Sequence, residues 1–425
     1  MRILLVGATG FIARALAPAL ERAGHAVVRL SRHGDPDGRP SVALDVASAR
    51  RARDWLGALT GVDAVVYAVG TFQEQGEQTF QALHVDGPHA LYEACVTQGV
   101  RRVVHLSPPG PHDGAASRYH LTKRASDRHL LGLPLRATVL QPSLVFGPDG
   151  ASARLFCRWA ALPLVPVPGR GAQRVQPVHL DDVVDAIVAT VQDDTTAGHT
   201  LALVGPEPLT LADYLRRLRR GLGLAPAPVV PVPMALARAA TRVASRLGDR
   251  LADPEALDML ARGNAAPDTG MRRLLGRPPR PVATFIGAPV DAWRVWAQAG
   301  WTLPMLRLAV AAVWLFTAVV SFGVFPVDQS RELLARVGAE GGFATLLLYG
   351  AAGTDLALGL AVLCLPHRRW VWVAQLLLIA GYTALITWRL PEFWWHPFGP
   401  ILKNLPMLAA IALLAALEAP RRWTT

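Results

Sequence analysis

Residues 2–23 read RILLVGATGFIARALAPALERA, a short apolar run followed by glycines and an amphipathic stretch. The run from Arg2 to Val6 has the length and composition of one buried parallel strand. Gly7 and Gly10 interrupt it, and a helical pattern begins at Phe11. Strand, glycine turn and helix in this order predict a site where backbone N–H groups and a helix N-terminus hold a diphosphate.

Ala13 stands where the usual dinucleotide pattern has its third glycine, at a position that mainly sets helix-on-strand packing. An ordinary tight strand–helix turn is the alternative interpretation, but the amphipathic helix that follows favours nucleotide binding. A signal peptide fits poorly because the apolar run is short and broken by glycine. The predicted cofactor contacts in this turn are Gly7, Thr9, Gly10, Phe11 and Ile12.

Strand and helix patterns continue to alternate along the N-terminal half, as in a doubly wound parallel sheet. We therefore expect an α/β Rossmann domain over residues 1–205. The further strands that the apolar runs predict are Ala26–Leu30, Val42–Asp45, Ala64–Tyr67, Arg102–Leu106 and Leu135–Gln141.

The end of the second predicted strand indicates which dinucleotide binds. NAD-binding folds usually place an acidic residue there for the ribose 2′-hydroxyl, but this chain has Ser31 and Arg32. A hydroxyl and a guanidinium suit a 2′-phosphate, so the sequence favours NADP over NAD. A solvated loop role for Arg32 is a nearly equal alternative. The other predicted cofactor contacts follow strand ends: Asp45 and Val46 toward the adenine, the backbone of Ala68, Val69 and Gly70, and Pro142.

Tyr119 and Lys123 are four residues apart, which places them on one face of a helix. A phenol has a pKa of about 10, and an ammonium group one turn away lowers that pKa and also binds ribose hydroxyls. Lys123 and Lys403 are the two lysines of the chain, whose other basic residues are arginine. The use of lysine at position 123 therefore indicates that the compact ammonium charge has a role there. We predict an acid/base pair, with a surface helix pair as the alternative.

Two later features complete the N-terminal half. Pro142 and Gly147 predict a defined loop over the nicotinamide end. A helix is expected after His179, with Asp181 or Asp182 as its N-cap. For His179 a structural role is preferred to a catalytic one.

Composition limits the other possibilities. The chain has 425 residues and a net charge of +11, but the basic residues are scattered and no DNA-binding motif is present, so nucleic acid is not an expected partner. Arginine beside membrane segments explains part of the excess. The three cysteines are far apart and indicate neither a disulfide framework nor a zinc site.

The N-terminal half resembles the short-chain dehydrogenase/reductase superfamily in its extended and atypical branches. The residues that carry the resemblance are G-A-T-G-F-I-A at 7–13, Asp45-Val46, H-V-D-G at 84–87, V-V-H-L-S at 103–107, Y-H-L-T-K at 119–123, Q-P-S-L-V-F-G-P at 141–148 and V-H-L-D-D-V at 178–183. The resemblance implies that Tyr119 is the catalytic acid/base and that Lys123 is its partner and a ribose ligand.

Two departures from the superfamily pattern bear on activity. Pro108-Pro109 occupy the stretch where the extended enzymes carry a catalytic serine or threonine, and His84 replaces an asparagine common in active members. Ser107 is our candidate for the missing hydroxyl, with Ser117 as an alternative. Both departures resemble the atypical subgroup that includes an accessory subunit of respiratory complex I, whose members bind NADPH without needing to catalyse a reaction.

Residues 206–290 read as a helical lobe that completes this domain. Residues 225–233 (APAPVVPVP) predict a stiff connector, and residues 277–281 (RPPRP) mark the end of the lobe. Between them, Met234 to Arg250 has apolar and arginine residues at helical spacing. We expect a lid helix packed on the nucleotide domain, with a helix at a membrane surface as the alternative.

The last quarter, about residues 300–420, predicts an all-α transmembrane domain of four helices. The apolar segments are Leu303–Phe325, Phe343–Leu365, Trp370–Trp388 and Leu402–Leu417. A buried soluble bundle is disfavoured because the 18 residues from Leu308 to Phe325 carry no charge. An interfacial belt is expected from the tryptophans at segment ends: Trp301, Trp370, Trp372, Trp388, Trp394 and Trp395.

Two polar residues lie within these segments, and intramembrane ionisable groups are functional candidates. Asp355 and Lys403 pair with each other in the structural alternative, and a transporter gated by NADPH is a weaker idea that rests on them alone. The segment resembles the DoxX-like membrane family through G-T-D-L-A-L-G-L at 353–360 and P-F-G-P-I-L-K-N-L-P at 397–406. Its best-known relatives are linked to quinone-related redox, which implies a lipid-soluble partner.

The leading hypothesis is a membrane-anchored NADP(H)-binding oxidoreductase acting on the carbonyl or hydroxyl of a lipophilic, quinone-like or lipid substrate. A non-catalytic NADPH sensor or assembly subunit of a membrane redox complex is the alternative. Four spans would return the chain to its starting side, with His367-Arg368-Arg369 and Arg421-Arg422 beside the nucleotide domain. We expect the inner membrane as the location, with the N-terminal domain in the cytoplasm because NADPH is there.

Overall fold

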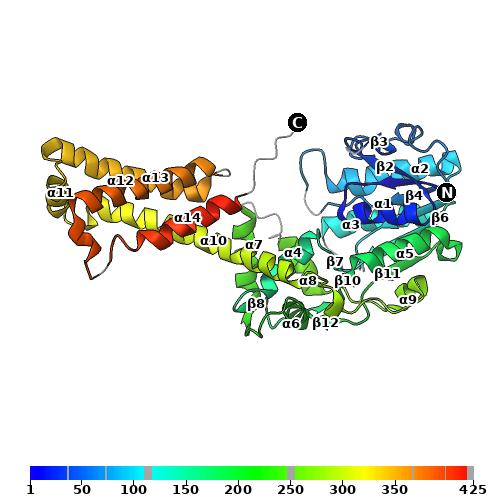
Figure 1. Cartoon of the computed structure of the whole chain (residues 1–425). Helices are drawn as coiled ribbons and strands as arrows, with labels where there is room; N and C mark the ends of the chain where they lie inside the picture. The colour runs from blue at the N-terminus through cyan, green and yellow to red at the C-terminus, as the bar shows by residue number, and fades with distance from the viewer. Residues whose placement is uncertain are drawn as a thin grey trace. The chain divides into compact units, whose positions relative to one another are not determined.

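The computed structural model describes residues 1–35, 38–71, 74–109, 117–246, 254–365, 368–397 and 399–418. They form two compact units, Met1–Ala297 and Gln298–Thr425, which are considered separately (Figure 1). The expected division of the first unit at residue 205 stays a prediction.

A parallel sheet is the centre of the first unit, as the alternating pattern predicts. Within the described residues it has seven strands in the order β11-β6-β5-β4-β1-β2-β3. The strands are β1 (Arg2–Val6), β2 (Ala26–Ser31), β3 (Ser41–Ala43), β4 (Ala64–Tyr67), β5 (Arg102–Leu106), β6 (Arg136–Pro142) and β11 (Thr200–Leu203).

The predicted bounds of β1, β4 and β5 are confirmed, whereas three other strands differ at their ends. Strand β2 extends through Ser31, and β6 lies one residue later than expected. Strand β3 ends at Ala43, so Asp45 lies in the turn that follows, where its carboxylate accepts a hydrogen bond from the Ala47 amide at 3.0 Å. Strand ends are decided by such local bonds rather than by the apolar pattern.

Both faces of the sheet are buried because successive side chains of a strand point to opposite sides. Leu4 and Val6 of β1 belong to a core with Trp55, and Ile3 and Leu5 belong to the core on the other face. The helices that contribute to these cores are α2 (Gly87–Gln98) and α3 (Arg118–Gly132) on the first face, and α1 (Phe11–Arg22), α5 (Leu180–Gln192) and α9 (Thr269–Leu275) on the second.

The rest of the first unit consists of short strands and helices. They are β7 (Val145–Phe146), α4 (Ala151–Ala160), β8 (Val165–Pro168), β9 (Arg174–Val175), β10 (Val178–His179), β12 (Leu209–Thr210), α6 (Leu211–Gly221), β13 (Val229–Val232), α7 (Met234–Arg246) and α8 (Pro254–Arg262). The predicted stiff connector forms β13, which pairs in parallel with β8. The helix expected from Met234 ends at Arg246, and the last residues of that prediction lie outside the described part of the chain.

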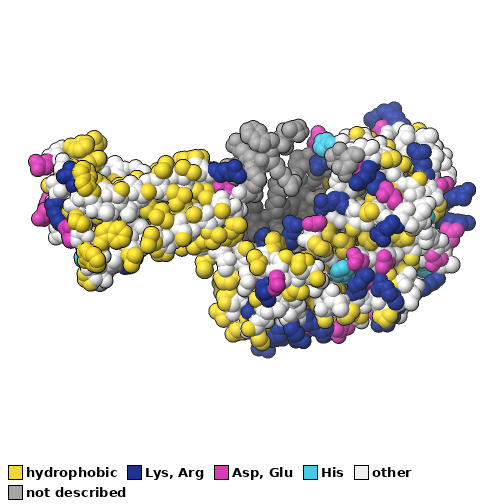
Figure 2. All heavy atoms as spheres, viewed as in Figure 1, with side chains coloured by type: hydrophobic (Ala, Val, Ile, Leu, Met, Phe, Trp, Pro, Cys, Tyr) yellow, Lys and Arg dark blue, Asp and Glu magenta, His cyan; other side chains and the backbone are white. Residues whose placement is uncertain are grey.

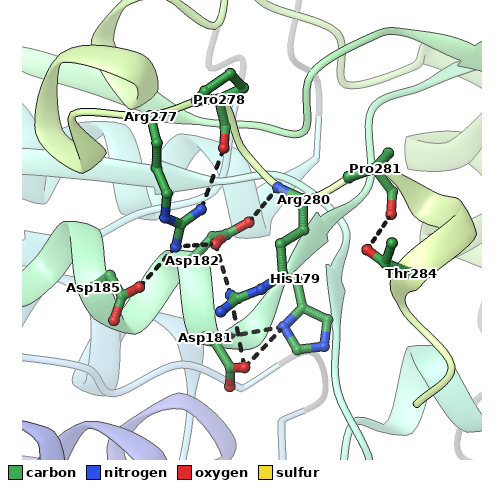
Figure 3. A network of polar contacts seen from close by, with 9 residues as sticks. All are labelled: His179, Asp181, Asp182, Asp185, Arg277, Pro278, Arg280, Pro281 and Thr284. Carbon is green, nitrogen blue, oxygen red and sulfur yellow. Dashed lines mark hydrogen bonds and ion pairs between the residues drawn. The ribbon is translucent and has the colours of Figure 1, made fainter.

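The segment after α9 is held on α5 by the network in Figure 3, which centres on the buried Asp182 carboxylate. Asp182 accepts hydrogen bonds from the Arg277 guanidinium at 2.8 Å and from the Arg280 backbone and guanidinium at 2.7 Å each. The expectation that Asp181 or Asp182 caps α5 is wrong. His179 is the N-cap, and its Nδ1 accepts from the Asp181 amide at 3.2 Å, which is a structural role.

Helices α10 (Val290–Val319), α12 (Gly341–Cys364), α13 (Arg369–Arg389) and α14 (Asn404–Leu417) share one apolar core in the second unit (Figure 1). The short α11 (Val327–Arg336) lies between α10 and α12 in sequence. Figure 2 shows hydrophobic side chains over most of the visible face of this unit, with charged side chains toward its ends. That distribution fits a surface that meets lipid.

Three of the helices in the described residues are long and apolar enough to cross a membrane: Val290–Val324, Gly341–Cys364 and Arg369–Arg389. The fourth expected span corresponds to α14, whose 14 residues give a helix of about 21 Å, shorter than a hydrocarbon core of about 30 Å. The structure therefore supports a helical membrane domain but not four full spans. The return of the chain to its starting side stays a prediction.

Details of the expected membrane features also differ. Trp370, Trp388 and Trp395 are exposed, as a belt requires, but Trp372 is buried and its indole donates to Glu418 at 2.6 Å. Asp355 is buried in α12, whereas Lys403 is exposed before α14, and among the described residues no ion pair joins them. His367, Arg421 and Arg422, which the topology prediction used, lie outside the described residues.

Asp182→Asn should destabilise the protein because it weakens three hydrogen bonds to a buried carboxylate. We expect a loss of about 2 kcal/mol in the free energy of unfolding, since the two arginines are part-exposed and regain water. Asp185→Asn is the matched control, because Asp185 is half-exposed and, among the described residues, its side chain bonds only Arg277, at 2.9 Å. Urea unfolding of the purified protein would contradict this reading if the two variants lost equal stability.

Candidate active site

Gly7 and Gly10 bring the first turn against the end of β4. Gly7 has a φ of +82°, and a Cβ there would lie 2.9 Å from Val69 Cγ2 and 3.2 Å from the Ala68 carbonyl carbon. A Cβ on Gly10 would lie 3.1 Å from the Gly7 carbonyl oxygen. The turn therefore has room only for glycine at these positions.

The N-terminus of α1 meets the requirements of a diphosphate site. Gly10 is the N-cap in an extended conformation, it supplies no side-chain cap, and the first turn of α1 has no acidic residue. The first backbone N–H groups of the helix are thus left for a ligand, and the helix dipole favours an anion there. Thr9 is exposed beside them, and Phe11 and Ile12 are half-buried.

The loop after β6 packs on the same helix end. A Cβ on Gly147 or Gly150 would lie 3.0 Å or 2.9 Å from Phe11 Cζ, so small residues allow this loop to cover the Phe11 ring. Pro142, the last residue of β6, is buried. The loop that the sequence predicted over the nicotinamide end therefore lies against the first turn of α1.

The end of β2 offers hydrogen-bond donors rather than a carboxylate. The Ser31 hydroxyl donates to the Gly34 carbonyl at 2.6 Å, and Arg32 is exposed. Asp35, the nearest acid along the chain, lies 3.4 Å from the Arg29 guanidinium. Arg32 is thus the exposed cation at this strand end, and a guanidinium is a type of group that binds phosphate.

Asp45 and Val46, expected near the adenine, differ in their surroundings. The Asp45 carboxylate accepts from the Gln78 side-chain amide at 3.0 Å and 3.1 Å. The Val46 side chain is buried in the core, where a Cβ on Gly87 would lie 2.6 Å from it. Of the two residues, Asp45 is therefore the one whose side chain places a polar group at the surface of the site.

Helix α3 positions Tyr119, Lys123 and Asp127 on one face, since they are four residues apart along it. Lys123 is buried, and its Nζ donates to the carbonyl of Val69, just after β4, at 2.9 Å and to that of Leu106, the last residue of β5, at 3.1 Å. Burial lowers the pKa of Lys123 to about 8, while the nearby Asp127 carboxylate opposes that shift. The ammonium group therefore lies at the sheet edge that Gly7 also approaches.

Tyr119 is buried among aromatic rings. Its ring is edge-on to those of Phe80, His84 and His120, at centroid distances of 5.8, 5.3 and 5.5 Å. Burial, and next the Asp127 charge, raise the pKa of the phenol. This shift is opposite to the one expected from the Tyr119–Lys123 spacing, because burial dominates the pKa of the phenol.

Ser107 is the first member of a chain of buried polar groups that continues through Asp127 and His105 to Tyr92. The Ser107 hydroxyl donates to Asp127 Oδ2 at 2.7 Å, His105 Nε2 lies 3.3 Å from Asp127 Oδ1, and the Tyr92 hydroxyl lies 2.6 Å from His105 Nδ1. Sequence analysis found Ser107 but missed the other three. Spacing was the available signal, because His105 lies two residues before Ser107 on a strand and Asp127 one helical turn after Lys123.

His84 occupies a π-helical turn, Ala82–Asp86, directly before α2. Its Nδ1 lies 3.1 Å from the Thr122 hydroxyl, and its Nε2 is buried without a hydrogen-bond partner in the described part of the chain. Burial, followed by the charges of Lys123 and His105, lowers the pKa of His84 to about 2. The imidazole at this position is therefore neutral.

Comparison with known proteins agrees with this geometry. The model of the NAD-dependent epimerase/dehydratase family matches residues 3–203, and the DoxX-like family matches residues 311–412. A 3-diazoavenalumate denitrifying reductase from Streptomyces is 30% identical over 271 residues, which cover 55% of this chain and 86% of that protein. The chain belongs to the NAD-dependent epimerase/dehydratase family.

Other proteins similar to this epimerase/dehydratase chain include a subunit of a respiratory complex and an enzyme of known structure. The 40 kDa subunit of NADH-ubiquinone oxidoreductase from Neurospora crassa is 23% identical over 224 residues, which cover 50% of this chain but only 58% of that subunit. The UDP-glucuronic acid 4-epimerase from Bacillus cereus, solved with NAD, is 18% identical and matches with a TM-score of 0.52 over 70% of this chain and all of that one. The latter likeness shows the fold alone.

Replacing His84 by asparagine should weaken the acid sensitivity of the protein. The folded state keeps His84 neutral, since its pKa is lowered to about 2, whereas the unfolded chain protonates it below about pH 6.5. The unfolded state then holds one more proton, so the free energy of unfolding falls by about 1.4 kcal/mol per pH unit below pH 6.5 for this group. His84→Asn should remove this contribution, which urea unfolding between pH 7 and pH 5 would measure.

The exposed His33 provides the control for this experiment, because His33→Asn should leave the pH dependence of wild type unchanged. An equal slope in wild type and His84→Asn would show that the imidazole is not held neutral.

Proposed function

We propose that this chain is a membrane-anchored NADP(H)-binding oxidoreductase acting on a carbonyl or hydroxyl of a lipophilic substrate. The observation that carries the proposal is the meeting of two elements at Val69. Its side chain is the nearest neighbour of a Cβ built on Gly7, and its carbonyl accepts from Lys123 Nζ at 2.9 Å. The diphosphate turn and the Tyr119–Lys123 pair thus belong to one site.

As part of this proposal we assign the cofactor residues. The turn from Gly7 to Ile12 would hold the diphosphate, Ser31 and Arg32 the ribose phosphate, and Lys123 the other ribose. Asp45 would face the adenine, and the backbone from Ala68 to Gly70 would lie along the dinucleotide. A reduced nicotinamide supplies a hydride to a carbonyl carbon when it is bound.

Tyr119 handles the accompanying proton in this proposal. Its hydroxyl donates the proton to the substrate oxygen, which leaves a phenolate, and in the opposite direction the phenolate takes the proton back. Because burial raises the pKa of Tyr119, formation of the phenolate depends on the positive charge of Lys123. Ser107 is assigned the third position, with its hydroxyl oriented by Asp127.

The membrane domain supports a substrate that partitions into lipid. A reductase whose chain also carries a DoxX-like domain and three bilayer-length helices is kept next to molecules dissolved in the membrane. The relative from Streptomyces is named as a reductase, in agreement with redox chemistry. We assign the protein to the inner membrane with its first unit in the cytoplasm, where NADPH is available.

A second candidate is a non-catalytic NADPH-binding subunit of a membrane redox complex. It is favoured by the enclosed phenol, by His84 and Pro108-Pro109 at the two departures that the family resemblance implies, and by the similarity to a subunit of NADH-ubiquinone oxidoreductase. Tight NADPH binding without turnover, together with co-purifying membrane subunits, would select this candidate.

Tyr119→Phe should abolish turnover but not cofactor binding. The variant removes only the hydroxyl, so we expect NADPH affinity within about threefold of wild type and a kcat lower by about 10²–10⁴, the usual contribution of a positioned acid. NADPH oxidation with a panel of carbonyls and quinones would be followed beside NADPH binding by fluorescence. Equal activity of wild type and Tyr119→Phe would exclude this acid, and absence of activity in both would favour the second candidate.

Arg32→Gln should separate the two dinucleotides. If the guanidinium binds the 2′-phosphate, its loss should weaken NADPH binding about 10- to 100-fold, the effect of one charge-assisted hydrogen bond, and leave NADH binding unchanged. His33→Gln, next in sequence and also exposed, is the control and should affect neither. Equal losses for NADPH and NADH in Arg32→Gln would contradict a 2′-phosphate site.

A further inference from the structure

Helix α7, Met234–Arg246, has an apolar side and a basic side. At 100° per residue, Leu236, Ala239, Ala240 and Val243 fall on one side of the helix. The three arginines, Arg238, Arg242 and Arg246, form a basic side that begins opposite the apolar side and runs round to its flank. The helix contains no acidic residue.

The apolar side of α7 is not covered within the first unit. Leu236 is 61% exposed and Val243 is 56% exposed, and Ala239 and Ala240 are also exposed. No α7 residue whose burial the structure describes is buried. The expected lid helix packed on the nucleotide domain is therefore wrong for this face, because a packed lid would bury it.

The basic side of α7 is equally open to a partner. Arg238 pairs with Asp258 of α8 at 3.0 Å, while Arg242 and Arg246 are exposed. An exposed apolar strip beside exposed arginines suits a surface that is apolar below and negatively charged above. A bilayer with anionic lipids has an apolar acyl region and negatively charged headgroups within one helix diameter of each other.

The chain itself carries the membrane-spanning segment that brings a bilayer within reach of α7. Helix α10 begins at Val290, 44 residues after α7 ends at Arg246, and is the first of the three helices long enough to span a bilayer. A covalent tether of this length keeps the first unit at a high effective concentration beside the membrane, so a weakly amphipathic helix suffices for contact.

We propose that α7 is an interfacial helix that lies on an anionic bilayer, with Leu236 and Val243 in the acyl region and Arg242 and Arg246 at the phosphates. The contact would hold the 206–290 lobe on the membrane. It requires no redox activity, so it can hold or fail independently of the proposed function.

The test places a fluorescent label on each side of α7 in the full chain. Cys364 is the exposed cysteine among three free ones, whereas Cys95 and Cys157 are buried, so Cys364→Ser gives a background for labelling. Val243→Cys and the control Ser245→Cys, two residues away on the basic side, would each carry an environment-sensitive dye. Each protein is reconstituted at one copy per nanodisc in phosphatidylglycerol-rich or purely phosphatidylcholine bilayers.

The expected result is blue-shifted emission from position 243 in the anionic nanodiscs, quenched by lipids spin-labelled in the acyl chain, and solvent-like emission from position 245. The shift should shrink in phosphatidylcholine and with Arg242→Glu and Arg246→Glu combined. Solvent-like emission from 243, or a blue shift that acyl-chain quenchers do not reach, would overturn the proposal. A blue shift that acyl-chain quenchers do not reach would mean that protein, rather than lipid, covers the apolar side of α7. A shift that appears only with two copies per nanodisc would identify that protein as a second copy of the chain.

Unchanged thermal unfolding of the labelled variants would show that they are folded. NADPH binding by the same samples keeps the two proposals apart, because a chain that binds NADPH with α7 in solvent would fail only the membrane contact.

Discussion

The close approach of the β1–α1 turn to the end of β4 is the constraint on which the candidate site depends. Gly7 adopts a positive φ, and no side chain fits between it and Val69. The Val69 carbonyl then accepts a hydrogen bond from Lys123 on α3, 54 residues later in the chain. A single strand end thus sets the distance between the anion-binding helix terminus and the buried ammonium group. Any residue larger than glycine at position 7 would shift the helix terminus and the ammonium group relative to each other. The turn is therefore a structural requirement of the site.

Charge balance explains why the buried polar groups beneath this site are tolerated. Lys123 and Asp127 are both buried one helical turn apart, and each charge would be costly alone. Lys123 is satisfied by two carbonyls, and Asp127 accepts from Ser107 and lies beside His105. His84 and His105 stay neutral, since burial lowers the pKa of each, so they add no further charge. The site therefore combines one buried cation and one buried anion, both on the helix that carries Tyr119, with neutral imidazoles.

The second unit obeys a different rule, because helices in lipid gain little from apolar contact alone. Its helices are apolar around most of their circumference, and a few polar contacts fix how they pack. The Trp314 indole on α10 donates to the buried Gln375 side chain on α13 at 2.7 Å, and Arg307 on α10 donates to the Val362 carbonyl on α12 at 2.8 Å. These contacts join residues that are 61 and 55 positions apart in sequence. They give the bundle a specific register that hydropathy does not contain.

The sequence by itself determined the class of both units and most strand positions, since period, glycine spacing and apolar length are local properties. It also located Gly7, Gly10, Tyr119 and Lys123, because their spacing is a chemical signal within a few residues. Tertiary structure decided burial and the contacts between distant residues, which residue spacing does not determine. Burial reversed the expected shift in the pKa of Tyr119, and His105, Asp127 and Tyr92 joined Ser107 only when β5, α2 and α3 packed together. The cap of α5, the length of α14 and the open face of α7 likewise depend on which neighbours a segment finds, and those neighbours are distant along the chain.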